Sequence, residues 1–132
     1  MSDRRPERIY GVLVREGHVF LRDYGGGRLG LPGGVFPPLA ENRKGELRLM
    51  LFDQLGIDAQ RTWAQGAFDY RDPADDREAF SGFYTVWEWQ GEVRPGTGRW
   101  VGHGDIAGLP GLAPSLRILL LSILDTVALR TT

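Results

Sequence analysis

The segment from Leu31 to Asp58, LPGGVFPPLAENRKGELRLMLFDQLGID, constrains the fold more than any other part of the chain. It opens with Pro32, Gly33 and Gly34, which favour a tight turn. It ends at Gly56, a residue type that commonly follows the last turn of a helix. The segment therefore begins with a turn of the kind found in phosphate-binding loops and ends as a capped helix. Leucine, methionine and phenylalanine lie between the two ends, where carboxylates would be expected.

The second half of this segment predicts a helix from Arg43 to Leu55. Asn42 is a residue type that caps helix N-termini, and Gly56 provides the stop signal. Apolar residues recur at every fourth position and predict one buried face. The core-facing residues are Leu47, Leu51 and Leu55.

Strand signals surround this helix. Two β-rich runs precede it, and Glu16-Gly17 joins them as a predicted hairpin. These and the later expected strands are Arg8–Arg15, His18–Asp23, Leu29–Leu31, Arg61–Tyr70, Ala79–Gln90 and Arg99–Val101. We expect loops at Arg71–Glu78 and Gly102–Gly108, and a last helix from Pro114 to about Leu129. Hairpins mixed with two helices predict an α+β domain with a mixed sheet.

Composition narrows the function classes. The length of 132 residues predicts a single domain spanning 1–132. A net charge of −1 gives no strong signal for a nucleic-acid partner. The chain has no cysteine, which excludes disulfides and thiol chemistry. The first residues lack the apolar core of a signal peptide, so we expect a cytoplasmic location.

The apolar stretch Leu116–Leu129 is the one segment that suggests a membrane. It is too short to span a bilayer, and it contains Arg117 and Asp125. We expect no membrane association. Simple burial is one interpretation of its apolar surface, and a homodimer contact is another.

The pattern LPGG…E…LG-I resembles that of the Nudix hydrolases, whose signature is G-x5-E-x7-R-E-U-x-E-E-x-G-U, with U an aliphatic residue. The resemblance extends over nearly the whole chain, including the late phrase RWVGHGDIAGL. It implies a Nudix-type α/β/α sandwich, with a mixed β-sheet between helices. Aligned from its end, the signature places Gly56-Ile57 on G-U, Asp53-Gln54 on the paired glutamates, Leu49-Met50 on Arg-Glu, and Glu41 on the first glutamate. Gly34 matches the starting glycine, with one extra residue before Glu41.

The resemblance also implies a magnesium site that this chain has partly lost. The family places three glutamates at i, i+3 and i+4 of one helix, and here these positions are Met50, Asp53 and Gln54. A thioether is a poor ligand for magnesium, and glutamine has no charge. The implied metal ligands are Asp53, Gln54 and the Gly33 carbonyl, with Glu41 and Asp53 as the catalytic residues. We therefore expect Mg²⁺ or Mn²⁺ to bind weakly, if at all.

Further acids offer partial compensation. Glu46 lies one turn before Met50, and the acidic loop that ends at Glu78 could fold over the site or remain solvated surface. With Gly34, the candidate substrate-binding residues are Glu46, Asp75, Asp76 and Glu78.

Two functions stay open at this point. The first is a Mg-dependent hydrolase of a nucleoside diphosphate-linked, pyrophosphate-containing substrate, with weak or altered activity. The second is a catalytically inactive domain that binds a nucleotide or a protein partner and serves in regulation. The family favours the first, whereas the loss of the signature arginine and two of three acids favours the second.

Overall fold

The computed structural model of the chain describes residues 5–131, with side chains described up to residue 127. Seven strands and three helices alternate along it. They are β1 (Arg8–Arg15), β2 (His18–Asp23), β3 (Leu29–Gly30), β4 (Gly33–Val35), α1 (Arg43–Leu55), β5 (Asp58–Asp72), β6 (Arg77–Gln90), β7 (Gly98–Gly102), α2 (His103–Gly108) and α3 (Pro114–Thr131).

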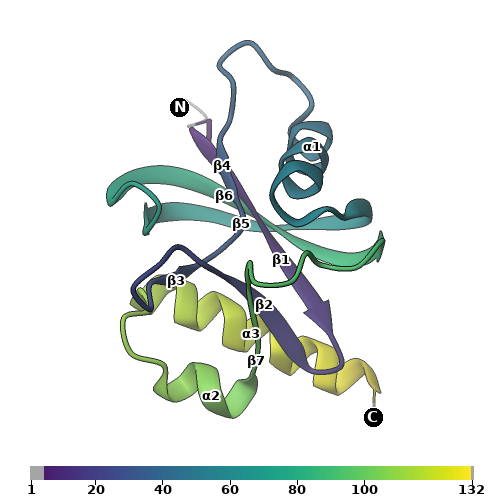
Figure 1. The fold of residues 1–132 in the computed structure, drawn as a ribbon, viewed down its shortest axis with the longest axis vertical. Helices are drawn as coiled ribbons and strands as arrows, with labels where there is room; N and C mark the ends of the chain where they lie inside the picture. The colour runs from purple at the N-terminus through teal and green to yellow at the C-terminus, as the bar shows by residue number, and fades with distance from the viewer. Residues whose placement is uncertain (1–4, 132) are drawn as a thin grey trace.

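The strands form one mixed sheet in the order β3-β2-β1-β6-β5, with β4 added to β1 and β7 added to β2. β1 and β6 run parallel, in a register that pairs Tyr10 with Phe83. The other pairs are antiparallel, and β5 with β6 is the longest of them. Figure 1 shows α1 on one side of this sheet and α2 and α3 on the other. The predicted α/β/α arrangement with a mixed sheet is confirmed.

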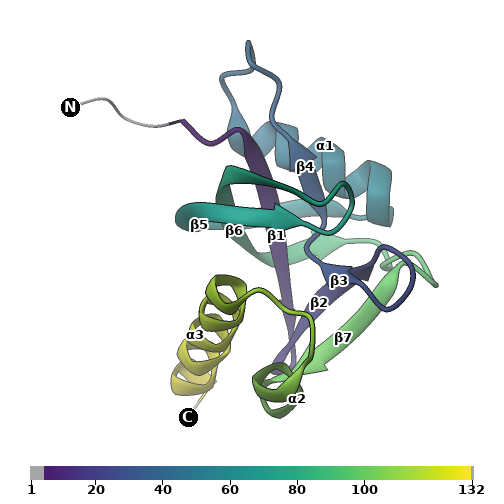
Figure 2. The ribbon, with the colours of Figure 1, turned by 90° about the vertical axis from the view of Figure 1, so that its left-hand side faces the viewer.

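The sheet divides the apolar interior into two cores because β1 alternates its side chains between the two faces. Tyr10, Val12 and Val14 contribute to the core under α3, whereas Ile9 and Leu13 contribute to the core under α1. Figure 2 shows α1 and α3 separated by the strands. Of the eight residues in β1, only Arg15 is exposed, so this strand forms the centre of the molecule.

α1 has the capping and packing that its sequence predicts. The Asn42 side chain accepts a hydrogen bond from the backbone N–H of Gly45 at 2.9 Å, and Gly56 has a φ of 77°. The three leucines at positions 47, 51 and 55 are fully buried. Leu51 packs close to the position a Cβ would occupy on Gly11 of β1, so the helix lies close against the sheet.

The structure differs from the expected elements in three places. Residues 103–108, predicted as a loop, form helix α2; buried Ile106 anchors it, although no side chain caps its N-terminus. Gly33 and Gly34, predicted as part of a turn, begin strand β4, which pairs with β1. The predicted loop at Arg71–Glu78 contracts to residues 73–76, because backbone pairing continues the β5–β6 hairpin past the apolar residues.

The final helix packs one face on the sheet and leaves another open. Leu116, Leu120 and Ile123 are buried, whereas Ile118 is 69% exposed. The stretch proposed as a dimer contact ends at positions 128 and 129, which lie outside the described side chains. The homodimer stays a prediction. Within residues 5–131, no helix is long and apolar enough to cross a membrane.

Candidate functional site

The Pro-Gly-Gly loop is held along β1 by hydrogen bonds. The Tyr24 hydroxyl donates to the Leu31 carbonyl at 2.7 Å, and the Leu31 N–H donates to the Tyr70 hydroxyl at 3.4 Å. The N–H of Gly11 donates to the Pro32 carbonyl at 3.0 Å. The burial of Tyr24 raises its pKa to about 12, so its hydroxyl remains a donor at neutral pH.

Gly33 is required by this geometry. Its φ is +139°, and an added Cβ would lie 2.2 Å from the carbonyl oxygen of Ile9. No side chain fits such a distance, so the loop approaches β1 as closely as a backbone can. Gly34 follows in the β4–β1 register opposite Ile9.

Gln54 joins this loop to α1. The Gly33 N–H donates to Gln54 Oε1 at 3.0 Å, and Gln54 Nε2 donates to the Gly33 carbonyl at 2.8 Å. The sequence predicted that these two residues lie close together, and the structure brings them into contact; their role as metal ligands stays a prediction. In this arrangement, however, the carbonyl oxygen of each residue accepts a hydrogen bond from an N–H group of the other.

The rest of the signature helix provides little charge for a metal ion. Asp53 is exposed, and Met50 packs partly buried against the core under α1. Arg94 donates to the carbonyls of Asp53 at 3.2 Å and Gln54 at 3.4 Å, which brings a positive charge to the same turn. Among the described residues, no three His, Cys, Asp or Glu side chains are grouped to hold a metal. These residues do not fit a magnesium cluster held by carboxylates.

Within residues 5–131, two of the other predicted acids make no polar contact with Gly33, Asp53 or Gln54. Glu41 is exposed in the segment before α1, and Glu46 is half-buried in its first turn. Within the described part of the chain, no hydrogen bond or ion pair connects either of them to Gly33, Asp53 or Gln54.

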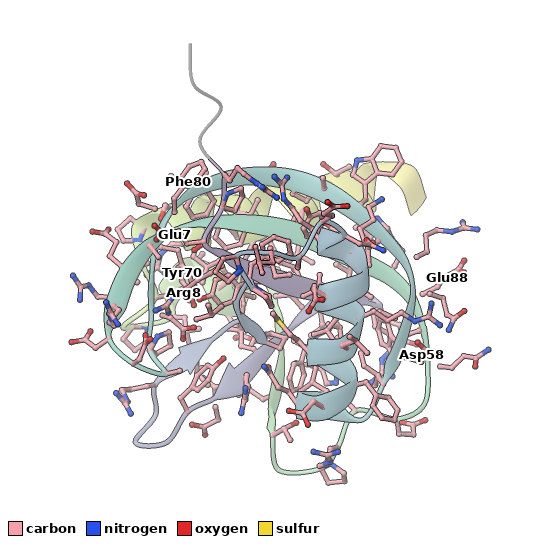
Figure 3. The ribbon with its side chains drawn as sticks, turned by 90° about the horizontal axis from the view of Figure 1, so that it is seen from above. Glu7, Arg8, Asp58, Tyr70, Phe80 and Glu88 are labelled. Carbon is pink, nitrogen blue, oxygen red and sulfur yellow. The ribbon has the colours of Figure 1, made fainter. Side chains whose placement is uncertain are left out.

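The acidic segment after β5 is built around a buried arginine that the sequence analysis missed. Arg8 is 7% exposed, and its guanidinium donates to both carboxylate oxygens of Asp75, at 3.0 and 2.7 Å. Asp72, 3% exposed, lies 3.6 Å from Arg8 and accepts a 2.6 Å hydrogen bond from the Tyr10 hydroxyl. Figure 3 labels Arg8 and Tyr70 at one end of the molecule, with Asp58 and Glu88 at the other.

The other acids of this segment remain on the surface. Asp76 forms an exposed ion pair with Arg71 at 3.5 Å, and exposed Glu78 lies opposite Arg71 in the hairpin. The sequence contained one sign of the Arg8–Asp75 ion pair, because Arg8 is a charged residue on the same face of β1 as Tyr10, Val12 and Val14. Its partners, however, lie far away in the sequence.

The Arg8–Asp75 contact predicts a pH dependence. The two hydrogen bonds from Arg8 lower the pKa of Asp75 below its ordinary value of 3.8. A group with a lowered folded-state pKa adds stability above its unfolded pKa, and this contribution is lost as the pH falls through the folded-state value. We expect Asp75→Asn to lower the melting temperature at neutral pH. The difference from the wild type should shrink below about pH 4.

Thermal melts from about pH 7 to pH 2.5 measure this effect. Glu92→Gln, in the exposed loop after β6, is the matched control and should leave the melting curve unchanged. A deficit in Asp75→Asn that persists undiminished in acid would contradict the assignment.

A cavity of about 530 Å³ opens on the α3 side of the sheet. It is bordered by Leu29, by the turn before α3 and by Tyr70, whose hydroxyl accepts the hydrogen bond from the Leu31 N–H. Arg28, Arg71 and Asp76 give it polar edges, and Leu112 and Leu116 give it apolar walls. Of the predicted substrate-binding residues, only Asp76 lines it. The sequence indicated neither arginine, because Arg71 lies in a segment that was predicted as a loop and Arg28 lies between two predicted strands.

Comparisons with known proteins agree with this architecture. No family model matches the sequence, and no curated protein matches it. Solved structures do match. A MutT Nudix hydrolase from Burkholderia pseudomallei has a TM-score of 0.66 and 26% identity, over 86% of this chain and 93% of that one. A MutT protein from Bacillus halodurans has a TM-score of 0.73 and 19% identity, over 91% and 82%.

A third similar structure is an ADP compounds hydrolase, with a TM-score of 0.64 and 16% identity over 97% of this chain and 75% of that one. The three matches cover the sheet and its flanking helices almost completely. The chain therefore has the Nudix hydrolase fold.

Proposed function

We propose that this chain is a Nudix-type hydrolase of weak activity that acts on a nucleoside diphosphate-linked or related phosphoanhydride substrate. The observation that supports it most is the contact between the Pro-Gly-Gly loop and α1, which brings Gly33 and the Asp53 turn together within a Nudix fold. The similar ADP compounds hydrolase supports the substrate class.

Charge explains why the activity would be weak. Magnesium is often held by one or two carboxylates together with the phosphates of the substrate. Asp53 would hold such an ion as a single carboxylate, although the described residues do not fit a cluster that binds the free ion. The bound metal would neutralise the phosphates and activate water. The chain's own part is to position the anhydride at the loop and to hold the organic group in the cavity at Tyr70, which is hydrogen-bonded to Leu31 just before that loop.

The cavity suits the non-phosphate part of the substrate. Its volume of about 530 Å³ lies in the range of small-molecule sites. Arg28 and Arg71 would donate hydrogen bonds to polar groups of this organic part, and Leu112 and Leu116 would contact an apolar ring face. Asp76 remains the proposed hydrogen-bond acceptor among the predicted substrate residues.

Asp53→Asn is the variant that tests the proposed catalytic role. We expect it to abolish turnover of ADP-sugars and dinucleotides in millimolar Mg²⁺ or Mn²⁺, because it removes the only carboxylate at the three glutamate positions. Phosphate-release assays on a substrate panel measure this. Glu88→Gln, which changes an exposed carboxylate on β6 that is paired with Arg61, is the control and should retain wild-type turnover. Unchanged turnover in Asp53→Asn would remove Asp53 from the mechanism.

One observation favours the second candidate, a domain that binds the nucleotide without cleaving it. The Gln54 amide satisfies both polar groups of Gly33, at 3.0 and 2.8 Å, so two of the three implied metal ligands are already paired. For such a domain, a nucleotide in EDTA should raise the melting temperature while no substrate of the panel is cleaved.

A further inference from the structure

The two hydrogen bonds between the Gln54 amide and the Gly33 backbone form what we call the Gln54 clamp. A side-chain amide presents one donor and one acceptor side by side, as a strand partner does. The Gly33 N–H and carbonyl face these two groups at 3.0 and 2.8 Å, so neither backbone group is left without a partner. The orientation of the amide is fixed, since the reverse orientation would place donor against donor.

A carboxylate at this position could not form the same contact. Both of its oxygens are acceptors, so the oxygen facing the Gly33 carbonyl would meet a second lone pair at about 2.8 Å. For an ionised carboxylate, such an arrangement holds only when a cation lies between the two oxygens. In this chain the Nε2 hydrogens of Gln54 provide the positive partner, so the loop needs no ion to approach α1.

The groups around the clamp also favour an amide, rather than a metal ion, as the link between the loop and α1. Arg94 donates to the carbonyls of residues 53 and 54, and its backbone N–H donates to the Leu55 carbonyl at 2.8 Å. A fixed cation on this turn lowers the attraction for a second, divalent one. Met50 adds a soft thioether that hard cations avoid.

We propose that Gln54 is a positioning residue that holds the Gly33–Gly34 loop against α1 in place of a metal ion. The loop is then ordered before any divalent cation or substrate arrives. This inference concerns the free protein and stands whether the site cleaves or only binds its ligand, so it does not rest on the proposed function.

The wild-type protein provides the first test. We expect hydrogen exchange at the Gly33 amide to be protected in EDTA and to change less than about twofold when millimolar Mg²⁺ is added. The melting temperature should likewise shift by less than about 1 °C. Protection of Gly33 that appears only with Mg²⁺ would overturn the proposal.

Two substitutions at Gln54 separate the clamp from general packing. Gln54→Glu in EDTA should lower the melting temperature by roughly 5–10 °C, and Mg²⁺ should restore it, because the ion now joins the two oxygens. Gln54→Met keeps a similar volume and should show a similar loss that Mg²⁺ does not restore. A purely structural role for the side chain would not produce this difference in metal response.

Gln65→Glu is the matched control, since it makes the same chemical change on the exposed surface of β5. We expect it to melt like the wild type with and without Mg²⁺. A Gln54→Met variant as stable as the wild type, or equal Mg²⁺ responses of Gln54→Glu and Gln65→Glu, would contradict the clamp. The wild-type exchange experiment decides the question even if Gln54→Glu does not fold.

Discussion

Replacing Arg8 with methionine is expected to lower the free energy of unfolding by about 3 kcal/mol, the low end of the range for a broken buried ion pair. The low end applies because Asp75 is 42% exposed and recovers water contacts. The carboxylate of Asp72 does not recover them, since its side chain is 5% exposed. Within the described residues, it would keep only the Tyr10 hydroxyl and the Ala74 N–H as partners. Urea denaturation followed by tryptophan fluorescence measures the loss.

Two further variants separate the buried charge from general effects of the substitution. Arg61→Met breaks an exposed pair with Glu88, in which the side chains are 70% and 59% exposed, and should cost no more than about 1 kcal/mol. Adding Asp72→Asn to Arg8→Met should recover part of the stability, because the amide removes the unpaired charge. If Arg8→Met costs as little as Arg61→Met, the Arg8 cluster is not a significant source of stability.

Restoring carboxylates with Met50→Glu and Gln54→Glu is expected to raise Mg²⁺ or Mn²⁺ affinity at least about 100-fold, because each added charge within a few ångströms of a divalent ion is worth about 2 kcal/mol even in water. The two positions and Asp53 lie on one face of α1, at i, i+3 and i+4. Titration calorimetry and the electron paramagnetic resonance of free Mn²⁺ measure the affinity.

Leu49→Glu with Phe52→Glu is the matched control for this variant. It adds the same charge to the same helix, at side chains that are 65% and 61% exposed. We expect at most a few-fold gain in affinity from it, because solvent and salt screen charges in that position. Equal gains in the two double variants would show that net charge, rather than the geometry of the Gly33 loop, controls the binding.

The elements that the sequence predicted well have local signals. Asn42 and Gly56 mark the ends of α1, and three leucines mark its buried face, so the helix bounds agree with the structure. The Glu16-Gly17 turn has positive φ at both positions, 52° and 75°, as a two-residue hairpin requires. Such features depend on neighbours a few residues away, which a sequence pattern can represent.

The elements that it missed depend on distant partners. β4 exists because Gly33 and Gly34 pair with β1, and two of its three residues are glycines, which favour turns rather than strands. Arg8 contacts acids in the turn after β5, so its burial could not be inferred from its neighbours. Gln54 was interpreted as a weakened metal ligand, because the sequence shows the missing charge but not the backbone groups that face the amide.

The central position of β1 has a consequence for the synthesis of the chain. Its parallel partner, β6, begins only at Arg77 and leaves the ribosome well after β1. Seven of the eight β1 residues are buried in the finished molecule, so a nascent chain exposes an apolar strand until β6 has emerged. The β5–β6 hairpin needs only the turn at 73–76 and can form first. We therefore expect the sheet to assemble late, with refolding limited by the long-range docking of β1 and helped by chaperones that bind extended apolar segments.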